Sequence, residues 1–198
     1  MIIFDVGAND GKSCCHFAND VNNTVYAFEP TPQLVEAHLR KYSQKNYVII
    51  QKAVTNFNGT AKFNIAGQSD WGCSSLYEFN DNLDKTWPGR WDFVKTAVID
   101  VECITMKAFI EQNNISIVDF LHCDTQGNDL LVLQSFEEHI DKLVSGEIEV
   151  FVQNPLYKGI NNSRNECVKF LEINGFKITA EQCNDAYGNE WNIHFSRK

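Results

Sequence analysis

In the stretch at residues 4–13, FDVGANDGKS, a short apolar run ends in Asp5, and two glycines follow with an asparagine between them. A glycine turn between a strand and a helix is a ligand site, because its backbone N–H groups point outward and no β-carbon blocks close approach. A second acid, Glu29, ends the next apolar run. An acid at that place accepts hydrogen bonds from both hydroxyls of a ribose. Asp5, Gly7, Gly11 and Glu29 therefore predict a nucleoside-binding turn.

Three ligands and one structural alternative compete for this turn. A phosphate-binding P-loop needs four residues between its glycines, and Gly7 and Gly11 enclose only three, so the P-loop is excluded. A dinucleotide turn needs a glycine where Asn9 stands, which disfavours an NAD-dependent oxidoreductase. S-adenosylmethionine fits without a pyrophosphate, with its amino-acid end at the turn and its ribose at Glu29. The structural alternative is a capped turn beside a surface glutamate.

The elements that must position these residues alternate between strands and helices. Strands are predicted at residues 1–5, 24–28, 47–54, 116–124 and 146–153. Helices are predicted at residues 12–19, 31–44, 105–113, 129–143 and 164–174, with Thr31 and Thr105 as caps and Pro32 at a first helical position. Outer strands are predicted at 58–65 and 96–104, and a terminal antiparallel hairpin at 175–182 and 190–196. This alternation is typical of an α/β domain with a parallel sheet.

A single domain, residues 1–198, is expected, with an inserted lid or substrate segment at 66–96. A polar segment of that length in a compact domain is usually a binding element. Trp71, Ser74 and Ser75 are expected to form the substrate wall, since aromatic faces stack on sugar rings and nucleobases. Trp87 and Trp91 either join that wall or pin the lid to the core.

Five motifs resemble one known family. They are FDVGANDG, FEP at 28–30, QKAVTNFNGTAKF at 51–63, SSL at 74–76 and VDFLHCDTQGNDLLVL at 118–133. Together they resemble the FkbM-type family of S-adenosylmethionine-dependent methyltransferases over residues 2–135. The resemblance implies a Rossmann-like class I methyltransferase fold, with a seven-stranded, mostly parallel sheet whose last strand is antiparallel. It also implies methylation of oxygen, often a sugar hydroxyl.

The cofactor-binding residues expected from the turn and the resemblance are Asp5, Gly7, Ala8, Asn9, Gly11, Glu29, Lys52 and Ala53. The chain departs from the family pattern at His122, where lysine is usual, and at Gln126, where an acid is usual. Because of these departures, a non-catalytic binding module with the same fold stays open as an alternative function.

His122 and Asp124 are the expected catalytic pair. Lying two apart on a strand, they share a face near the cofactor, where His122 would take the proton of a hydroxyl and Asp124 would orient substrate or cofactor. The alternative for His122 is a histidine packed in the core, and the alternative for Asp124 is a cap on the following helix. Asp124 and Asp129 are too small a set for a metal site, and no C-x-x-C pair exists, so no metal is expected.

The composition and charge of the chain limit the classes of partner that it is expected to bind. The formal net charge of −9 repels a phosphate backbone, so a small-molecule or glycan acceptor is expected rather than a nucleic acid. No stretch approaches the roughly 20 apolar residues of a membrane span. No signal peptide is apparent, and seven scattered cysteines indicate reduced thiols, so a cytoplasmic protein is expected. The sequence indicates no oligomeric state.

Overall fold

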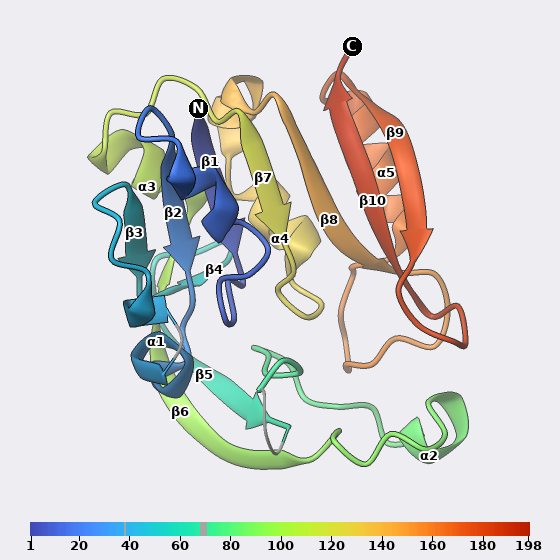
Figure 1. The fold of residues 1–198 in the computed structure, drawn as a ribbon. Helices are drawn as coiled ribbons and strands as arrows, with labels where there is room; N and C mark the ends of the chain where they lie inside the picture. Colours follow the sequence, from blue (N-terminus) through green and yellow to red (C-terminus); the bar gives the residue numbers. More distant parts are fainter. Residues whose placement is uncertain (38, 68–70) are drawn as a thin grey trace.

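The computed structural model describes residues 1–37, 39–67 and 71–198, and a seven-stranded sheet forms its centre (Figure 1). The strand order is β3-β2-β1-β7-β8-β10-β9. The strands are β1 (Ile2–Val6), β2 (Thr24–Phe28), β3 (Tyr47–Ile50), β7 (Phe120–Cys123), β8 (Ser145–Phe151), β9 (Phe176–Cys183) and β10 (Glu190–Arg197). Neighbours pair in parallel from β3 to β8, whereas β10 runs antiparallel to β8 and β9. The expected α/β fold is confirmed.

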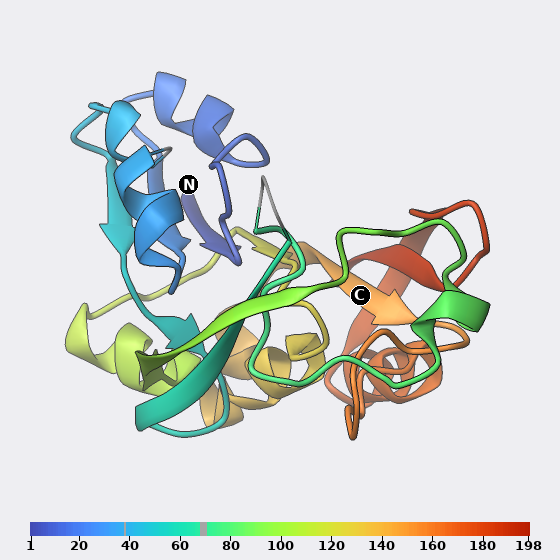
Figure 2. The same ribbon diagram turned by 90° about the horizontal axis from the view of Figure 1, so that it is seen from below.

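Helices cover both faces of this sheet (Figure 2). On one face, against β1 to β3, lie η1 (Cys15–Asn19), α1 (Pro32–Ala37) and η2 (Leu39–Lys41). On the other face lie α3 (Met106–Gln112), α4 (Asp129–Gln134), η3 (Glu137–Lys142) and α5 (Arg164–Ile173). Within the described ranges, every helix is too short or too polar to cross a membrane.

The strand β1 is buried on both faces, which explains its nearly continuous apolar sequence. Phe4 and Val6 belong to the larger core cluster, under α3 and α4, and Phe4 meets Phe28 and Phe109 edge to face. Ile3 belongs to the cluster under η1 and α1. Strand side chains alternate in direction, so Asp5 points to the same face as Ile3. Its carboxylate is fully buried there and needs polar partners.

A second, three-stranded sheet crosses the carboxyl ends of β1, β2 and β7 (Figures 1 and 2). Its strands are β4 (Ala53–Val54), β5 (Gly59–Ala66) and β6 (Lys95–Ile104), in the order β4-β6-β5. The segment between β5 and β6 carries α2 (Leu83–Thr86) and corresponds to the lid expected at 66–96. Residues 68–70 of that lid lie outside the described residues, as does position 38 of the helix expected at 31–44.

Four expected elements differ from the structure. Of the helix predicted at 31–44, the structure describes α1 and the 3-10 helix η2, which ends at Lys41. The strand predicted at 47–54 divides between the two sheets, because the amide of Lys52 donates to Ile50 O (2.8 Å) and turns the chain. The helix predicted at 12–19 is the short 3-10 helix η1. The helix predicted at 129–143 ends after Gln134, where Ser135 Oγ donates to Val132 O (2.7 Å) and accepts from Met106 N (3.0 Å). Ser135 thus serves the start of α3 rather than the continuation of α4.

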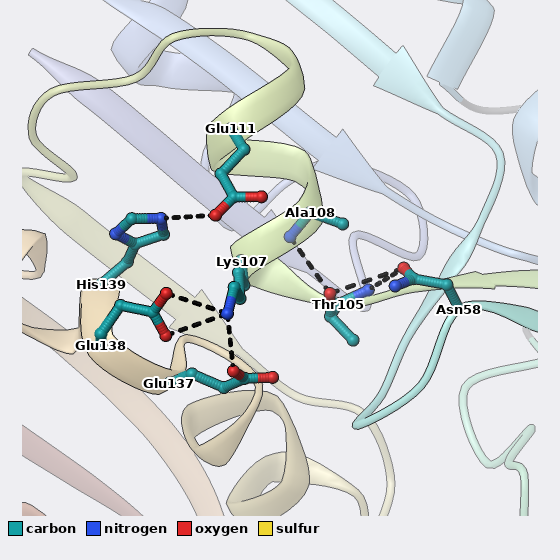
Figure 3. A network of polar contacts seen from close by, with 8 residues as sticks. All are labelled: Asn58, Thr105, Lys107, Ala108, Glu111, Glu137, Glu138 and His139. Atoms are coloured by element: carbon teal, nitrogen blue, oxygen red, sulfur yellow. Dashed lines mark hydrogen bonds and ion pairs between the residues drawn. The ribbon is translucent and has the colours of Figure 1, made fainter.

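The predicted cap at Thr105 is confirmed, and it sits in a network that fixes α3 (Figure 3). Thr105 Oγ1 accepts from Ala108 N (3.1 Å), while Asn58 Oδ1 accepts from Thr105 N (2.9 Å). Lys107 joins α3 to η3 through two exposed ion pairs, with Glu137 and Glu138. Exposed pairs add little stability, so the buried cap matters more for holding α3 against β6.

Candidate cofactor cleft

A cleft of about 580 Å³, including the part open to solvent, lies at the carboxyl ends of β1, β2 and β7. In a parallel α/β sheet this is the edge where ligands bind. Of the expected site residues, the cleft brings together Gly7, Asn9, Glu29, Lys52, Ala53, Trp71, Ser74 and Asp124. Asp5, Ala8, Gly11, Ser75 and His122 lie outside its lining.

The turn after β1 forms one wall of the cleft and requires glycine at position 7. Gly7 has φ +80°, and a β-carbon there would overlap the backbone carbonyl oxygen of Asp124. The amides of Gly7 and Ala8 both donate to Phe28 O, at 3.0 and 2.9 Å, so the turn is held to the end of β2. Asn9 has φ +47°, a left-handed conformation that asparagine tolerates. This explains why asparagine can stand where a dinucleotide turn has glycine.

Glu29 closes the turn from the other strand. Its Oε2 accepts from Asn9 N (3.0 Å) and its Oε1 from Thr31 N (2.7 Å), and only 5% of the residue is exposed. Burial raises the pKa of Glu29, although the two amide hydrogen bonds oppose that rise. Each carboxylate oxygen has a second lone pair, so Glu29 can still accept two hydroxyl hydrogen bonds.

Thr31 lines the cleft, and the prediction that its side chain caps α1 is wrong. Its Oγ1 is buried and has no hydrogen-bond partner within the described chain. A buried hydroxyl without a partner is costly, so this atom marks a place where a ligand could supply one. The sequence feature that could have identified Thr31 as a cleft residue is its position directly after Glu29 and Pro30. Apolar residues complete this side of the cleft: Val6, Phe28, Pro30, Leu34, Val54, Phe63 and Leu76.

Asp124 follows β7 and is held by Gln126. The Nε2 of Gln126 donates to Asp124 Oδ1 (2.8 Å) and to Glu149 Oε2 (3.0 Å), and Tyr157 donates to Gln126 Oε1 (2.8 Å). Burial and the charge of Asp124 raise the pKa of Glu149 well above its usual range. A neutral amide that donates to two carboxylates relieves their repulsion. This explains how glutamine can stand here in place of an acid.

The alternative role of Asp124, as a helix cap, does not hold. The residue at the N-cap of α4 is Asn128, whose side chain instead donates to Val54 O at 2.7 Å. Both Asp124 and Asn128 line the cleft, and neither side chain caps α4.

His122 pairs with Asp5 behind the turn, with 2.9 Å between Nδ1 and Oδ1. Burial alone would lower the pKa of His122, but the hydrogen bond and charge of Asp5 outweigh it and raise the pKa to about 9. An imidazole that is protonated at pH 7 and absent from the cleft lining is poorly suited to take a proton there. The expectation of His122 as general base therefore gains no support from this geometry.

The remaining lid residues divide between cleft and core. Ser74 lines the cleft, whereas Ser75 is fully buried and donates to Gln126 O (2.8 Å). Trp71 lines the cleft. Trp87 is 1% exposed and its Nε1 donates to Asn154 O (3.1 Å), so it pins the lid to the core; Trp91 is 67% exposed.

Comparisons with known proteins give one family match and several likenesses of fold. Residues 5–178 match a family model described as the methyltransferase FkbM domain. No curated protein matches the chain. Among solved structures, a chain of a fibrillarin/Nop5p complex is 17% identical at a TM-score of 0.51, over 100% of this chain and 72% of that one.

Two further solved structures were determined with S-adenosylmethionine bound. Magnesium protoporphyrin IX methyltransferase from Synechocystis is 10% identical at a TM-score of 0.52, over 99% of this chain and 69% of that one. Fibrillarin from Aeropyrum pernix is 11% identical at a TM-score of 0.51, over 98% of this chain and 65% of that one. At these identities the likeness concerns the fold.

Proposed function

The chain belongs to the methyltransferase FkbM domain family, and on that premise we propose that it is an S-adenosylmethionine-dependent O-methyltransferase. Its acceptor is a hydroxyl of a sugar, a glycan or another small molecule. The observation that carries the proposal is the hydrogen bond from Asn9 N to Glu29 Oε2, which places a glycine turn and a buried carboxylate in the lining of one cleft.

The donor set of the cleft fits the cofactor. The free lone pairs of Glu29 suit the two ribose hydroxyls, and the unpaired hydroxyl of Thr31 offers a further hydrogen bond. Leu34 and Phe63 contribute an apolar wall suited to the adenine ring. The missing β-carbon at Gly7 lets the end of β7 pack against the turn, because Asp124 O lies where a side chain would be.

The chemistry is an in-line displacement. When bound, S-adenosylmethionine supplies a methyl group activated by its positively charged sulfur, and the acceptor oxygen must approach opposite that sulfur. Alignment contributes much of the acceleration in such a transfer. Asp124 lines the cleft with one carboxylate oxygen fixed by Gln126, so it is suited to accept the hydrogen bond of the acceptor hydroxyl and hold it in line. Asp124 then takes the hydroxyl proton as the methyl–oxygen bond forms and the methyl–sulfur bond breaks. Gln126 then acts as a positioning residue.

Trp71 and Ser74 support a sugar-like acceptor. They lie in the lining contributed by the lid, where an indole ring can stack on a sugar face and a hydroxyl can bond to it. The net charge of −9 disfavours a nucleic acid acceptor. The seven cysteine thiols are consistent with a reducing compartment, and we place the protein in the cytoplasm.

A turnover assay tests the proposal. Purified protein is incubated with S-adenosylmethionine and a panel of monosaccharides, short glycans and phenols, and S-adenosylhomocysteine is measured by mass spectrometry. We expect acceptor-dependent product formation that falls at least about tenfold in Asp124→Asn, a loss of roughly 1.4 kcal/mol of transition-state stabilisation. The matched control is Asp141→Asn, at an exposed position. Cofactor binding without transfer to any acceptor would favour the non-catalytic binding module.

A further inference from the structure

Three side chains of the types that ligate metal ions lie behind the glycine turn that follows β1. Asp5 on β1, Cys14 at the start of η1 and His122 on β7 each offer a ligand atom, and these atoms all lie within 4.8 Å of one another. Asp5 and His122 are 117 positions apart, which is why no local spacing in the sequence signals the cluster. None of the three lines the cofactor cleft.

The polar atoms of this cluster are incompletely satisfied. Asp5 is fully buried, and its Oδ2 has no hydrogen-bond partner within the described chain, although its Oδ1 faces His122. Tyr47 Oη is buried and equally unpartnered, and the charges of both Asp5 and Cys14 act on it. Buried oxygen atoms are nearly always bonded, so two without partners beside one thiol point to a missing group.

We propose that Asp5, Cys14 and His122 form a binding site for a Zn²⁺ ion. Thiolate, imidazole and carboxylate are the three ligand types that zinc takes, and mixed sets of three protein ligands leave a fourth position for another oxygen. A water molecule fills that position. Binding releases the proton of the Cys14 thiol and one proton of the His122 imidazolium. The charges of Asp5 and the Cys14 thiolate then neutralise the divalent ion, so the occupied site carries no net charge in the core.

The surroundings of the site favour this reading over an accidental grouping. Glu147 is the register partner of His122 on β8 and adds negative charge beside the imidazole. Among the described residues, no helix covers this face of β8 and β10, which leaves His122 a side that is 16% exposed as a path for the ion (Figure 1). A second cluster, Glu111, Glu138 and His139, lies mostly exposed on the surface, where Lys107 already pairs with Glu138 (Figure 3).

A metal at this site would brace the cofactor cleft without entering it. Asp5 lies two residues before Gly7, and His122 two residues before Asp124, so one ion would tie together the two strand ends that form the cleft. Cys14 adds the start of η1 to the same clamp. The expected role is structural: the ion holds the turn and stabilises the fold.

Cobalt substitution tests the site independently of any enzymatic activity. The full-length protein is stripped with a chelator and titrated with Co²⁺, and the near-ultraviolet absorption of a cobalt–thiolate bond is followed. Zn²⁺ is then added to displace Co²⁺, and the melting temperature is measured with and without Zn²⁺. The variants are Cys14→Ser and His122→Gln, and the controls are Cys15→Ser and Cys183→Ser, which leave the three ligands intact. Circular dichroism of the metal-free variants confirms that each is folded.

We expect one equivalent of Co²⁺ per chain, a cobalt–thiolate band in wild type and both controls, and a rise in melting temperature on adding Zn²⁺. Cys14→Ser loses the band and the rise, and His122→Gln weakens binding. A band that persists in Cys14→Ser places the ion elsewhere and overturns the proposal. Absence of stoichiometric binding to the wild type overturns it as well, and assigns the unpartnered oxygens to buried water.

Discussion

The backbone carbonyl oxygen of Asp124 occupies the space that a β-carbon on Gly7 would need. The ends of β1 and β7 therefore approach each other closely only because residue 7 has no side chain. Asp124 N also donates to Val6 O (2.9 Å), so the same two strand ends are hydrogen-bonded. This contact brings the glycine turn after β1 and Asp124 into the lining of one cleft.

Gly7→Ala should destabilise the protein by more than a left-handed alanine alone would. The cost of the left-handed conformation is roughly 1–2 kcal/mol, and the collision with the carbonyl adds to it. Gly159→Ala is the matched control, since Gly159 has φ +68° but open space around its β-carbon position. Urea unfolding should show a larger loss for Gly7→Ala. Equal losses of unfolding free energy in the two variants would show that the backbone at Asp124 moves to accommodate the β-carbon at little cost.

Gln126→Glu should destabilise the protein at neutral pH. The substitution replaces an amide that donates to Asp124 and Glu149 with a third acid beside them. Repulsion disfavours the ionised form of the introduced acid, so part of the lost stability should return as pH falls and that acid is protonated. Melting temperatures at pH 8 and pH 5, each relative to wild type, measure this. The exposed Gln33→Glu is the control, and a pH-independent difference would contradict the account.

Asp129→Asn should remove a pH dependence of stability. Burial, with the charge of Asp124, raises the pKa of Asp129 to about 7. A carboxyl whose pKa is higher in the folded state contributes stability at low pH that is lost as pH rises from about 4 to about 7. The loss is on the order of 1.4 kcal/mol per pH unit. The unfolding free energy of the variant minus that of the wild type should therefore increase as pH rises from about 4 to about 7. A difference that does not change with pH would exclude a raised pKa of Asp129.

Thr31→Val should leave the unliganded protein at least as stable while weakening cofactor binding. Valine keeps the shape of threonine and the amide that donates to Glu29, but removes a buried hydroxyl without a partner. Losing one neutral hydrogen bond to the cofactor costs roughly 1 kcal/mol, or about a fivefold rise in Kd. Thermal melts test the expected stability, and equilibrium dialysis with S-adenosylmethionine tests the expected rise in Kd. An unchanged Kd would place this hydroxyl outside the contact with S-adenosylmethionine.

The sequence predicted the parts of the fold that depend on local pattern. Apolar runs located the strands. Thr105 marked the start of α3 and Pro32 marked the start of α1, because capping and proline geometry act within one turn of chain. The end of α4 at Ser135 was not predictable locally. Its cause is a hydrogen bond from Met106, which lies far away in the sequence.

The site was predictable to the same extent. Gly7, Asn9 and Glu29 follow from the strand–turn–helix pattern, and the structure places them in one cleft. The pairing of His122 with Asp5 was not, because alternation along a strand gives the face of a side chain but not its neighbour across the sheet. Register with β1 brings His122 beside a buried acid and away from the cleft.

The central claim is that Glu29 holds the ribose of S-adenosylmethionine, and calorimetric titration tests it most directly. The cofactor is titrated into wild type, Glu29→Gln and the exposed control Glu36→Gln, with NAD as control ligand. Glutamine offers one carbonyl oxygen where two backbone amides now bind a carboxylate. We predict that wild type and Glu36→Gln bind S-adenosylmethionine and not NAD, and that Glu29→Gln binds about 1–3 kcal/mol more weakly. Equal affinity of folded Glu29→Gln and wild type would contradict the account.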